Sequence, residues 1–215
     1  MPIAVVTGAA GFIGSSLSEA LLDRGYRVRG VDNLTTGRRT NLRSLKNRDG
    51  FKFHEVDIRD KSAMNDLVEG AEYVFHQAAV PSVPRSVDDP ITTTDANCTG
   101  TATIHDAARR ADVDTVVVAS SSSVYGSSTG LPKVESMTPD PESPYALSNY
   151  YKMKLAIQFG ALYDIDTVAL RYFNVFGPGQ NPNGEYAAVI PKFVQRMLDG
   201  DRPTIYGDGE QSRDF

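Results

Sequence analysis

The sequence has few of the residues that build disulfide frameworks or metal centres. Its 215 residues include one cysteine, Cys98, so no disulfide can form within the chain, and this content fits a reducing compartment. The three histidines, His54, His76 and His105, are scattered and lack the spacing of a metal site. The sequence therefore predicts neither a disulfide-stabilised fold nor a metal site, and we interpret Cys98 as a small packing residue.

Long apolar runs and an excess of positive charge are also missing. No apolar run approaches the roughly 18 residues of a membrane-spanning helix, and the first predicted strand begins at residue 3, which leaves no room for a signal peptide. The formal net charge of −5 provides no basic surface for nucleic acid. A hydrophobic content of 40% and a charged content of 23% are typical of a soluble globular protein, which we expect to be cytoplasmic.

What the sequence does contain is a glycine-rich turn between a strand pattern and a helix pattern. Apolar residues 3–7 precede Gly8, Gly11 and Gly14, and an amphipathic segment covers residues 12–24. Glycines at this spacing let the backbone approach a pyrophosphate, and the helix N-terminus offers free N–H groups and a partial positive charge. A chance cluster of glycines in a turn is the alternative interpretation.

An acidic residue at the end of the second predicted strand, residues 27–31, favours the dinucleotide site. Asp32 follows Gly14 by 18 residues, close to the spacing of about 20 at which a carboxylate binds the ribose hydroxyls of adenosine. It also favours NAD over NADP, because its charge would repel a 2′-phosphate. Arg38 and Arg39 lie close enough in the sequence to weaken that preference.

Strand and helix patterns alternate along the chain. After Asp32, strands are predicted at 51–56, 73–77 and 115–119, with helices at 61–69 and 97–111. This alternation predicts an α/β fold, a Rossmann-type doubly wound parallel sheet. Ligands collect at the carboxyl ends of such strands, and each polar cluster of the sequence follows a strand: 8–14, Asp32, Asp57, 77–82 and 120–123.

Two further segments carry candidate chemistry. The serine run 120–123 follows the fifth strand, although a bare serine run is more simply interpreted as a solvated loop. Pro144 and Tyr145 open a helix that is predicted to reach about residue 163, and proline suits a first helical turn. A tyrosine at the ligand edge could act as acid or base; the ordinary tyrosine pKa of about 10 means that it would need a neighbouring cation and the positive nicotinamide ring.

These motifs together resemble the extended short-chain dehydrogenases/reductases, the family of nucleotide-sugar epimerases and dehydratases. The resemblance covers essentially the whole chain, through Thr7-Gly8-x-x-Gly11-Phe12-Ile13-Gly14, Asp32-Asn33-Leu34, Asp57-Ile58, His76-Gln77-Ala78-Ala79, Asn97-x-x-Gly100-Thr101, Ser120–Gly126, Ser143-Pro144-Tyr145 and Leu170-Arg171-Tyr172-Phe173-Asn174. More narrowly, residues 171–177, 181–184 and 186–192 resemble UDP-N-acetylglucosamine/UDP-glucose 4-epimerases.

The resemblance implies an NAD-binding Rossmann domain over residues 1–175 and the start of a truncated nucleotide-sugar-binding domain over 176–215. It implies that NAD contacts Gly8, Gly11, Phe12, Ile13, Gly14, Asp32, Asn33, Thr36, Gly37, Asp57, Ile58, Gln77, Ala78, Ala79, Asn97, Ser120, Tyr145 and Tyr172. The UDP-sugar would contact Ser82, Ser121, Ser122, Tyr145, Asn174, Ala188, Val189 and Arg213. Catalysis would rest on Ser121 and Tyr145, with Asn149 in the position where the family usually has lysine.

The implied reaction is 4-epimerisation of a UDP-hexose or UDP-N-acetylhexosamine through a 4-keto intermediate, with NAD retained, in a homodimer. The 4,6-dehydratases place an Asp-Glu pair where this chain has Ser122 and Ser123, so the residues disfavour a dehydratase. A UDP-glucuronate epimerase on the same fold is a further alternative. A nucleotide-binding protein with little or no catalysis is the alternative from a different class.

That last alternative is motivated by two departures from the family pattern. The pattern Tyr-x-x-x-Lys is broken, because Asn149 supplies no charge. Lys152, seven residues after Tyr145, shares nearly the same helix face but lies a turn too far, and Tyr150-x-x-x-Lys154 is a second match that would move the tyrosine away from the helix start. The chain also stops where the family continues, so we expect a fragment of a longer protein and weakened catalysis.

Overall fold

The computed structural model describes residues 1–181 and 189–212, and it divides into two compact units, Met1–Arg171 and Tyr172–Phe215. The first unit is built on six strands, in the spatial order β3-β2-β1-β4-β5-β6. Their bounds are β1 Ile3–Thr7, β2 Arg27–Asp32, β3 Phe51–Glu55, β4 Tyr73–His76, β5 Thr115–Ser121 and β6 Asp166–Tyr172.

The strand order reverses beside β1, and this point of reversal determines where the ligand crevice lies. β1 pairs in parallel with both β2 and β4, β2 pairs in parallel with β3, and β4 with β5. The chain therefore winds outward from β1 in one direction and then returns to wind in the other. In such sheets the ligand crevice lies outside the carboxyl ends of the strands at the point of reversal. The predicted Rossmann-type α/β fold is confirmed.

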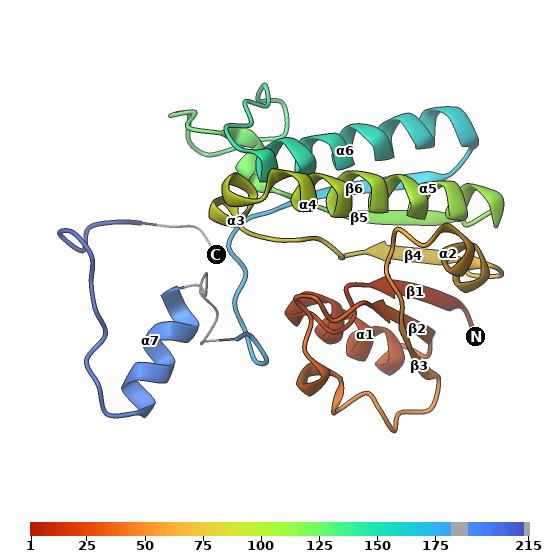
Figure 1. The fold of residues 1–215 in the computed structure, drawn as a ribbon, viewed down its shortest axis with the longest axis horizontal. Helices are drawn as coiled ribbons and strands as arrows, with labels where there is room; N and C mark the ends of the chain where they lie inside the picture. The colour runs from red at the N-terminus through yellow and green to blue at the C-terminus, as the bar shows by residue number, and fades with distance from the viewer. Residues whose placement is uncertain (182–188, 213–215) are drawn as a thin grey trace. The chain divides into compact units, whose positions relative to one another are not determined.

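Helices connect the strands and cover both faces of the sheet (Figure 1). Alternate residues of β1 enter different cores: Val5 packs in one cluster with Val74, Val116 and Ile104, whereas Val6 packs in the other. A strand that is buried on both faces is typical of a parallel sheet. The α-helices of this unit are α1 Phe12–Asp23, α2 Lys61–Val68, α3 Val83–Asp88, α4 Pro90–Thr94, α5 Gly100–Arg110 and α6 Pro144–Tyr163. The short helical turns of other types are η1 Arg39–Leu42, η2 Asp95–Thr99 and η3 Ser122–Tyr125.

The larger differences from the sequence prediction lie in three segments. The helix predicted at 97–111 is divided into a π-helical turn, η2, and α5. The fifth strand continues to Ser121, so Ser120 and Ser121 belong to the strand and not to a loop. Helices α3 and α4 occupy residues between 83 and 94, where no helix was predicted.

The second unit, taken by itself, contains the helix α7 Val189–Leu198 among its described residues. Several of its apolar side chains are exposed, among them Val194, Met197 and Leu198. Over residues 1–181 and 189–212, no helix combines the length and apolar character that a membrane crossing requires.

Candidate functional site

The glycine turn after β1 has a geometry that only glycine permits at two positions. Gly8 has φ +69°, and an added Cβ there would lie 2.8 Å from the backbone nitrogen of Ala78. A Cβ at Gly14 would lie 2.1 Å from the carbonyl oxygen of Gly8. Gly11 caps α1 without any side-chain hydrogen bond, so the first N–H groups of the helix have no partner within it. The turn is thus a close-packed cradle that presents free amides to an anion.

Asp32 is fixed at the end of β2 beside this cradle. Its carboxylate accepts hydrogen bonds from the backbone N–H groups of Ala10, at 3.0 Å, and Leu34, at 2.8 Å. Burial raises its pKa, and these two hydrogen bonds lower it in part. An added Cβ at Gly37 would lie 2.6 Å from the carboxylate, so the loop containing Thr36 and Gly37 passes directly over Asp32. The structure therefore holds the predicted ribose-binding acid in a defined orientation.

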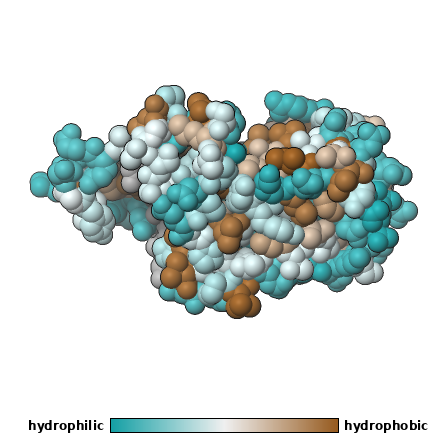
Figure 2. Space-filling model, turned by 90° about the horizontal axis from the view of Figure 1, so that it is seen from above, coloured by the Kyte–Doolittle hydropathy of each residue, from teal (hydrophilic) through white to brown (hydrophobic). Residues whose placement is uncertain are grey.

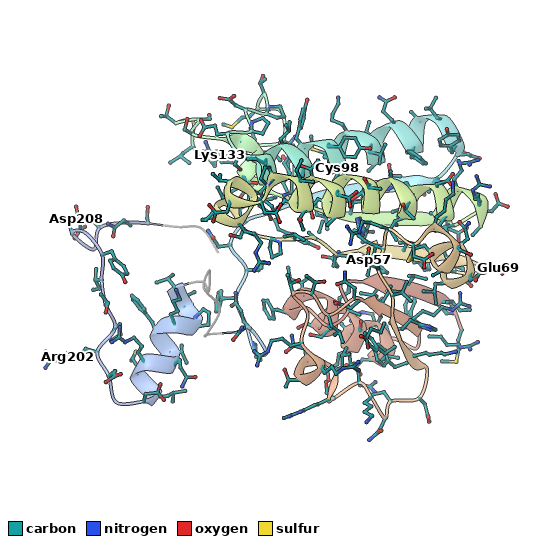
Figure 3. The ribbon with its side chains drawn as sticks, in the orientation of Figure 1. Asp57, Glu69, Cys98, Lys133, Arg202 and Asp208 are labelled. Atoms are coloured by element: carbon teal, nitrogen blue, oxygen red, sulfur yellow. The ribbon has the colours of Figure 1, made fainter. Side chains whose placement is uncertain are left out.

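Asp57 and Asn33 are brought together at the neighbouring strand ends. The Asn33 amide donates to Asp57 at 2.9 Å, and Arg59 donates to both carboxylate oxygens, at 2.9 and 2.7 Å. This bidentate pair holds the pKa of Asp57 well below its usual range. Arg59 also contacts Asp95 at 2.6 Å and so ties the loop after β3, where Asp57 lies (Figure 3), to η2. Sequence reasoning missed Arg59, because the partner Asp95 lies 36 residues further along the chain.

A buried hydrogen-bonded chain fixes the end of β4. The Thr7 hydroxyl accepts from the Ala78 N–H at 3.1 Å and lies 2.8 Å from His76 Nδ1, so it donates to that nitrogen. Thr101 donates to the Asn97 carbonyl at 2.5 Å, so it accepts from His76 Nε2–H at 2.9 Å. Burial keeps the pKa of His76 well below its ordinary value. His76 is therefore a neutral structural link between β1, β4 and α5.

Gln77 and the loop after it face the same edge. Both polar atoms of the Gln77 side chain are buried and have no hydrogen-bond partner among the described residues. The loop that follows is held by Asn97, whose amide accepts from Val80 N–H at 2.8 Å and donates to Ser148 at 3.0 Å. Ser82 caps α3 by accepting from Arg85 N–H. A buried amide without hydrogen-bond partners is costly.

The end of β5 is hydrogen-bonded to the first turns of α6, and these two elements carry the candidate catalytic residues. Ser143 caps this helix by accepting from Ala146 N–H at 3.1 Å, and half-buried Tyr145 follows Pro144 in the first turn. The Asn149 amide donates back to the Tyr145 carbonyl at 3.0 Å, and the Ser120 hydroxyl donates to the Asn149 carbonyl at 3.1 Å. The structure thus groups the strand end and Tyr145 around Asn149.

The serines after Ser120 begin the short helix η3. Ser121 Oγ accepts from Ser123 N–H at 3.1 Å and caps η3. This leaves the Ser121 O–H proton to donate elsewhere. Ser122 lies within η3 and is partly exposed. The serine run is therefore a strand end and a capped turn, not a solvated loop.

The remaining predicted contacts lie elsewhere. Tyr172, Asn174 and Val189 belong to the second unit. Ala188 and Arg213 lie outside the described residues. No group of three or more metal-ligating side chains is present over the ranges that the structure describes.

The residues present fit a dinucleotide. The Gly8–Gly14 turn packs tightly and exposes backbone amides, Asp32 is held in a defined orientation, and the Gln77 amide has no hydrogen-bond partner among the described residues. These three features lie at adjacent carboxyl ends of β1, β2 and β4. The arrangement matches what a nicotinamide dinucleotide requires of a Rossmann fold.

Comparison with known proteins gives an independent result. The sequence model of the NAD dependent epimerase/dehydratase family matches residues 4–215. The UDP-glucose 4-epimerase of Mycolicibacterium smegmatis is 43% identical over 213 residues, which are 98% of this chain and 68% of that protein.

Solved structures agree with the sequence match. A UDP-N-acetylglucosamine 4-epimerase from Methanobrevibacter ruminantium, in complex with UDP-N-acetylmuramic acid, is 41% identical with a TM-score of 0.94; the match covers 100% of this chain and 68% of the other. A UDP-glucuronic acid 4-epimerase from Bacillus cereus, in complex with UDP-glucuronic acid and NAD, is 35% identical with a TM-score of 0.88 and the same coverage.

Proposed function

Because the chain belongs to the NAD-dependent epimerase/dehydratase family, whose cofactor is NAD, we propose that it catalyses 4-epimerisation of a UDP-hexose or UDP-N-acetylhexosamine. One observation favours 4-epimerisation over the other reactions of the family. Ser120, at the end of β5, donates a hydrogen bond to the Asn149 carbonyl in α6, the helix that carries Tyr145. The related 4,6-dehydratases have an acid and a base where this chain has Ser122 and Ser123, which supports epimerisation over dehydration.

NAD would be held by the residues at the strand ends. The Gly8–Gly14 turn would bind the pyrophosphate, Asp32 the adenosine ribose, and the pair of Asn33 and Asp57 the adenine side. Gln77 would satisfy its buried amide against the nicotinamide half. When bound, NAD supplies reversible hydride transfer at C4 of the sugar.

The chain's own residues would provide proton transfer and orientation. Tyr145 would take the proton of the C4 hydroxyl and later return one to the C4 oxygen. Ser121 would donate its O–H to the same oxygen, since its hydroxyl accepts from Ser123 N–H and its proton remains available. Asn97, whose amide is engaged by Val80 and Ser148, would act by positioning the loop.

Two of the similar proteins named above are named for different sugars, glucose and glucuronic acid, so the identity of the sugar is the more specific part of the proposal. Ser82, Ser122, Asn174, Ala188, Val189 and Arg213 are the residues that we propose select it.

The experiment begins with the purified chain. Denaturation should release NAD, identified by mass, and the chain should interconvert UDP-glucose with UDP-galactose or their N-acetyl forms. Tyr145→Phe should keep the NAD and lose the interconversion. A 4-keto-6-deoxy product would instead identify a dehydratase. Retained NAD without turnover on any of the four UDP-sugars would identify a nucleotide-binding protein.

We also propose a homodimer formed through α5 and α6. Leu147, Ile157 and Leu162 of α6 are exposed apolar side chains, and Figure 2, which views the side on which α6 lies in Figure 1, shows apolar areas on that face. Light scattering should give twice the mass of the chain, and Ile157→Lys should reduce it to the single mass. A single mass for the wild type would contradict this assembly.

A further inference from the structure

A surface cavity of about 310 Å³ lies between α2 and the strands β1, β2 and β3. Four basic residues line it: Arg27 and Arg29 of β2, and Lys52 and His54 of β3. Among the described residues of its lining, Asp66 of α2 is the only acidic one. A volume of this size lies at the lower end of the range of small-molecule sites. In a chain with a net charge of −5, the cavity is a local concentration of positive charge.

The strand register brings these basic residues together. Arg29 pairs with Lys52 on the neighbouring parallel strand, and Arg27 pairs with Ile3 of β1. Side chains two residues apart on a strand point to the same face, so Arg27 and Arg29 share a face, as do Lys52 and His54. Neighbouring strands lie about 4.8 Å apart, and a step of two residues along a strand spans about 7 Å. The four side chains therefore start from one small area of the sheet.

No carboxylate of the described residues forms an ion pair with these cations. The ion pairs of residues 1–181 and 189–212 form on other basic residues: Arg39, Arg48, Arg59, Lys61, Arg109 and Arg110. Over the same ranges, none joins Arg27, Arg29 or Lys52 to a carboxylate. Like charges this close together repel one another, and a bound anion would relieve that repulsion.

Arg29 is held in place, whereas the side chains of Arg27 and Lys52 are exposed. The Arg29 guanidinium donates from Nη1 to the carbonyl oxygen of Leu67, at 2.9 Å, and to that of Glu69, at 2.7 Å, at the end of α2 (Figure 3). A guanidinium has five N–H donors, so donors on its Nε and Nη2 remain. The cavity therefore combines one oriented guanidinium with two cations that are accessible to solvent.

His54 senses the charge of the cavity without binding a ligand itself. Its Nε2 is covered by protein atoms and has no hydrogen-bond partner among the described residues. Burial lowers the pKa of His54, and the positive charges of Lys52 and Arg29 lower it further. An anion beside those two cations would oppose their effect. The pKa of His54 should therefore rise when the cavity is occupied.

We propose that this cavity binds a phosphate group, as the free ion or as part of a small molecule, through the guanidinium groups of Arg27 and Arg29 and the ammonium group of Lys52. Guanidinium groups match the geometry of phosphate oxygens, and a lysine adds a compact positive charge. The site lies away from the cofactor edge of the sheet, since Arg27 begins β2 and Asp32 ends it. It is a second anion site and does not depend on the proposed function.

The test titrates the protein with glycerol 3-phosphate, and separately with inorganic phosphate, in a calorimeter at constant ionic strength and with saturating NAD. Bound NAD occupies the glycine turn after β1, so phosphate binding there does not contribute. The wild type should show saturable binding at one site. Tighter binding of glycerol 3-phosphate would identify a phosphate ester as the ligand, and binding of inorganic phosphate that is equal or tighter would identify the free ion.

Substitutions of exposed residues locate this binding. Lys52→Met should weaken the affinity at least about tenfold, which corresponds to the loss of one hydrogen bond between charged groups. Lys46→Met is the matched control, because Lys46 is an exposed lysine outside the cavity; its affinity should stay within about twofold. Asp66→Asn removes the opposing carboxylate and should strengthen binding about threefold, a gain that cannot arise from a loss of structure.

NMR of the histidine side chains provides an independent measurement. The ring signals of His54, assigned by their absence in His54→Gln, should show a higher pKa in the presence of the ligand. The double variant Arg27→Met with Lys52→Met should show no such rise. Heat without saturation, an equal affinity in the wild type and the double variant, or a pKa of His54 that the ligand leaves unchanged would each overturn the proposal.

Discussion

Replacing Lys152 by methionine should stabilise the NAD-free protein, and the size of the effect follows from the burial of the ammonium. An ordinary lysine has a pKa of 10.5, and burial lowers that of Lys152 to about 8. Each pKa unit corresponds to about 1.4 kcal/mol, so the folded state opposes protonation of Lys152 by about 3 kcal/mol. Methionine has a similar length and no charge to desolvate.

The sign of the pH dependence is fixed by the same shift. Below pH 8 Lys152 is protonated in both folded and unfolded chains, and the penalty is fully present. Between pH 8 and 10.5 the unfolded chain binds more protons than the folded one, so stability rises with pH. The advantage of Lys152→Met should therefore be about 3 kcal/mol at pH 7 and vanish near pH 10.5.

Urea unfolding of NAD-free wild type, Lys152→Met and the exposed control Lys154→Met, at pH 7 and again near pH 10, measures this difference. Lys154→Met should change the free energy of unfolding by less than about 0.5 kcal/mol at either pH. A less stable Lys152→Met, or a difference that does not depend on pH, would refute the reasoning.

Three other outcomes are expected. Gly14→Ala should lower the free energy of unfolding by about 3 kcal/mol or more and abolish NAD retention, because its Cβ would meet the Gly8 carbonyl at 2.1 Å. A variant with a normal melting temperature and bound NAD would contradict the close packing of this turn. Asp32→Ser should lower the ratio of NAD to NADP affinity, measured by calorimetry, and an unchanged ratio would remove Asp32 from the ribose site. Asp57→Asn should release Arg59 and reduce stability most above pH 5, because the Asp57 carboxylate stabilises the fold only where it is ionised. Equal losses of stability at pH 7 and at strongly acidic pH would count against a stabilising Asp57–Arg59 pair.

The sequence predicted the sheet because strand patterns and the glycine turn are local signals. Gly8, Asp32 and Asp57 each follow a strand directly, so parallel strands alone bring them to one edge. Ion pairs between distant residues could not be predicted from local patterns. Arg59, which pairs with Asp57, also bonds to Asp95, 36 residues further along the chain. The π-helical turn at 95–99 was also missed, since it continues the helical pattern without a local marker.

The burial of Lys152 could not be predicted from the sequence. Tyr150, Tyr151, Lys152 and Lys154 form a pattern typical of a polar and aromatic helix surface, and Tyr151 and Lys154 are indeed exposed. Lys152, between them, is buried together with Ser148, Asn149 and Ala156. Charged residues are almost never fully buried without a partner, so no pattern in the sequence indicates the exception.

The central claim, epimerisation with a retained NAD, is tested most directly by the hydrogen at C4 of the sugar. Epimerisation in D₂O, followed by NMR of the UDP-sugar product, should show an inverted C4 that carries no deuterium, because the hydrogen removed from C4 returns to it. Deuterium at C4 would contradict the account, and so would a chain that holds NAD yet converts none of the UDP-sugars.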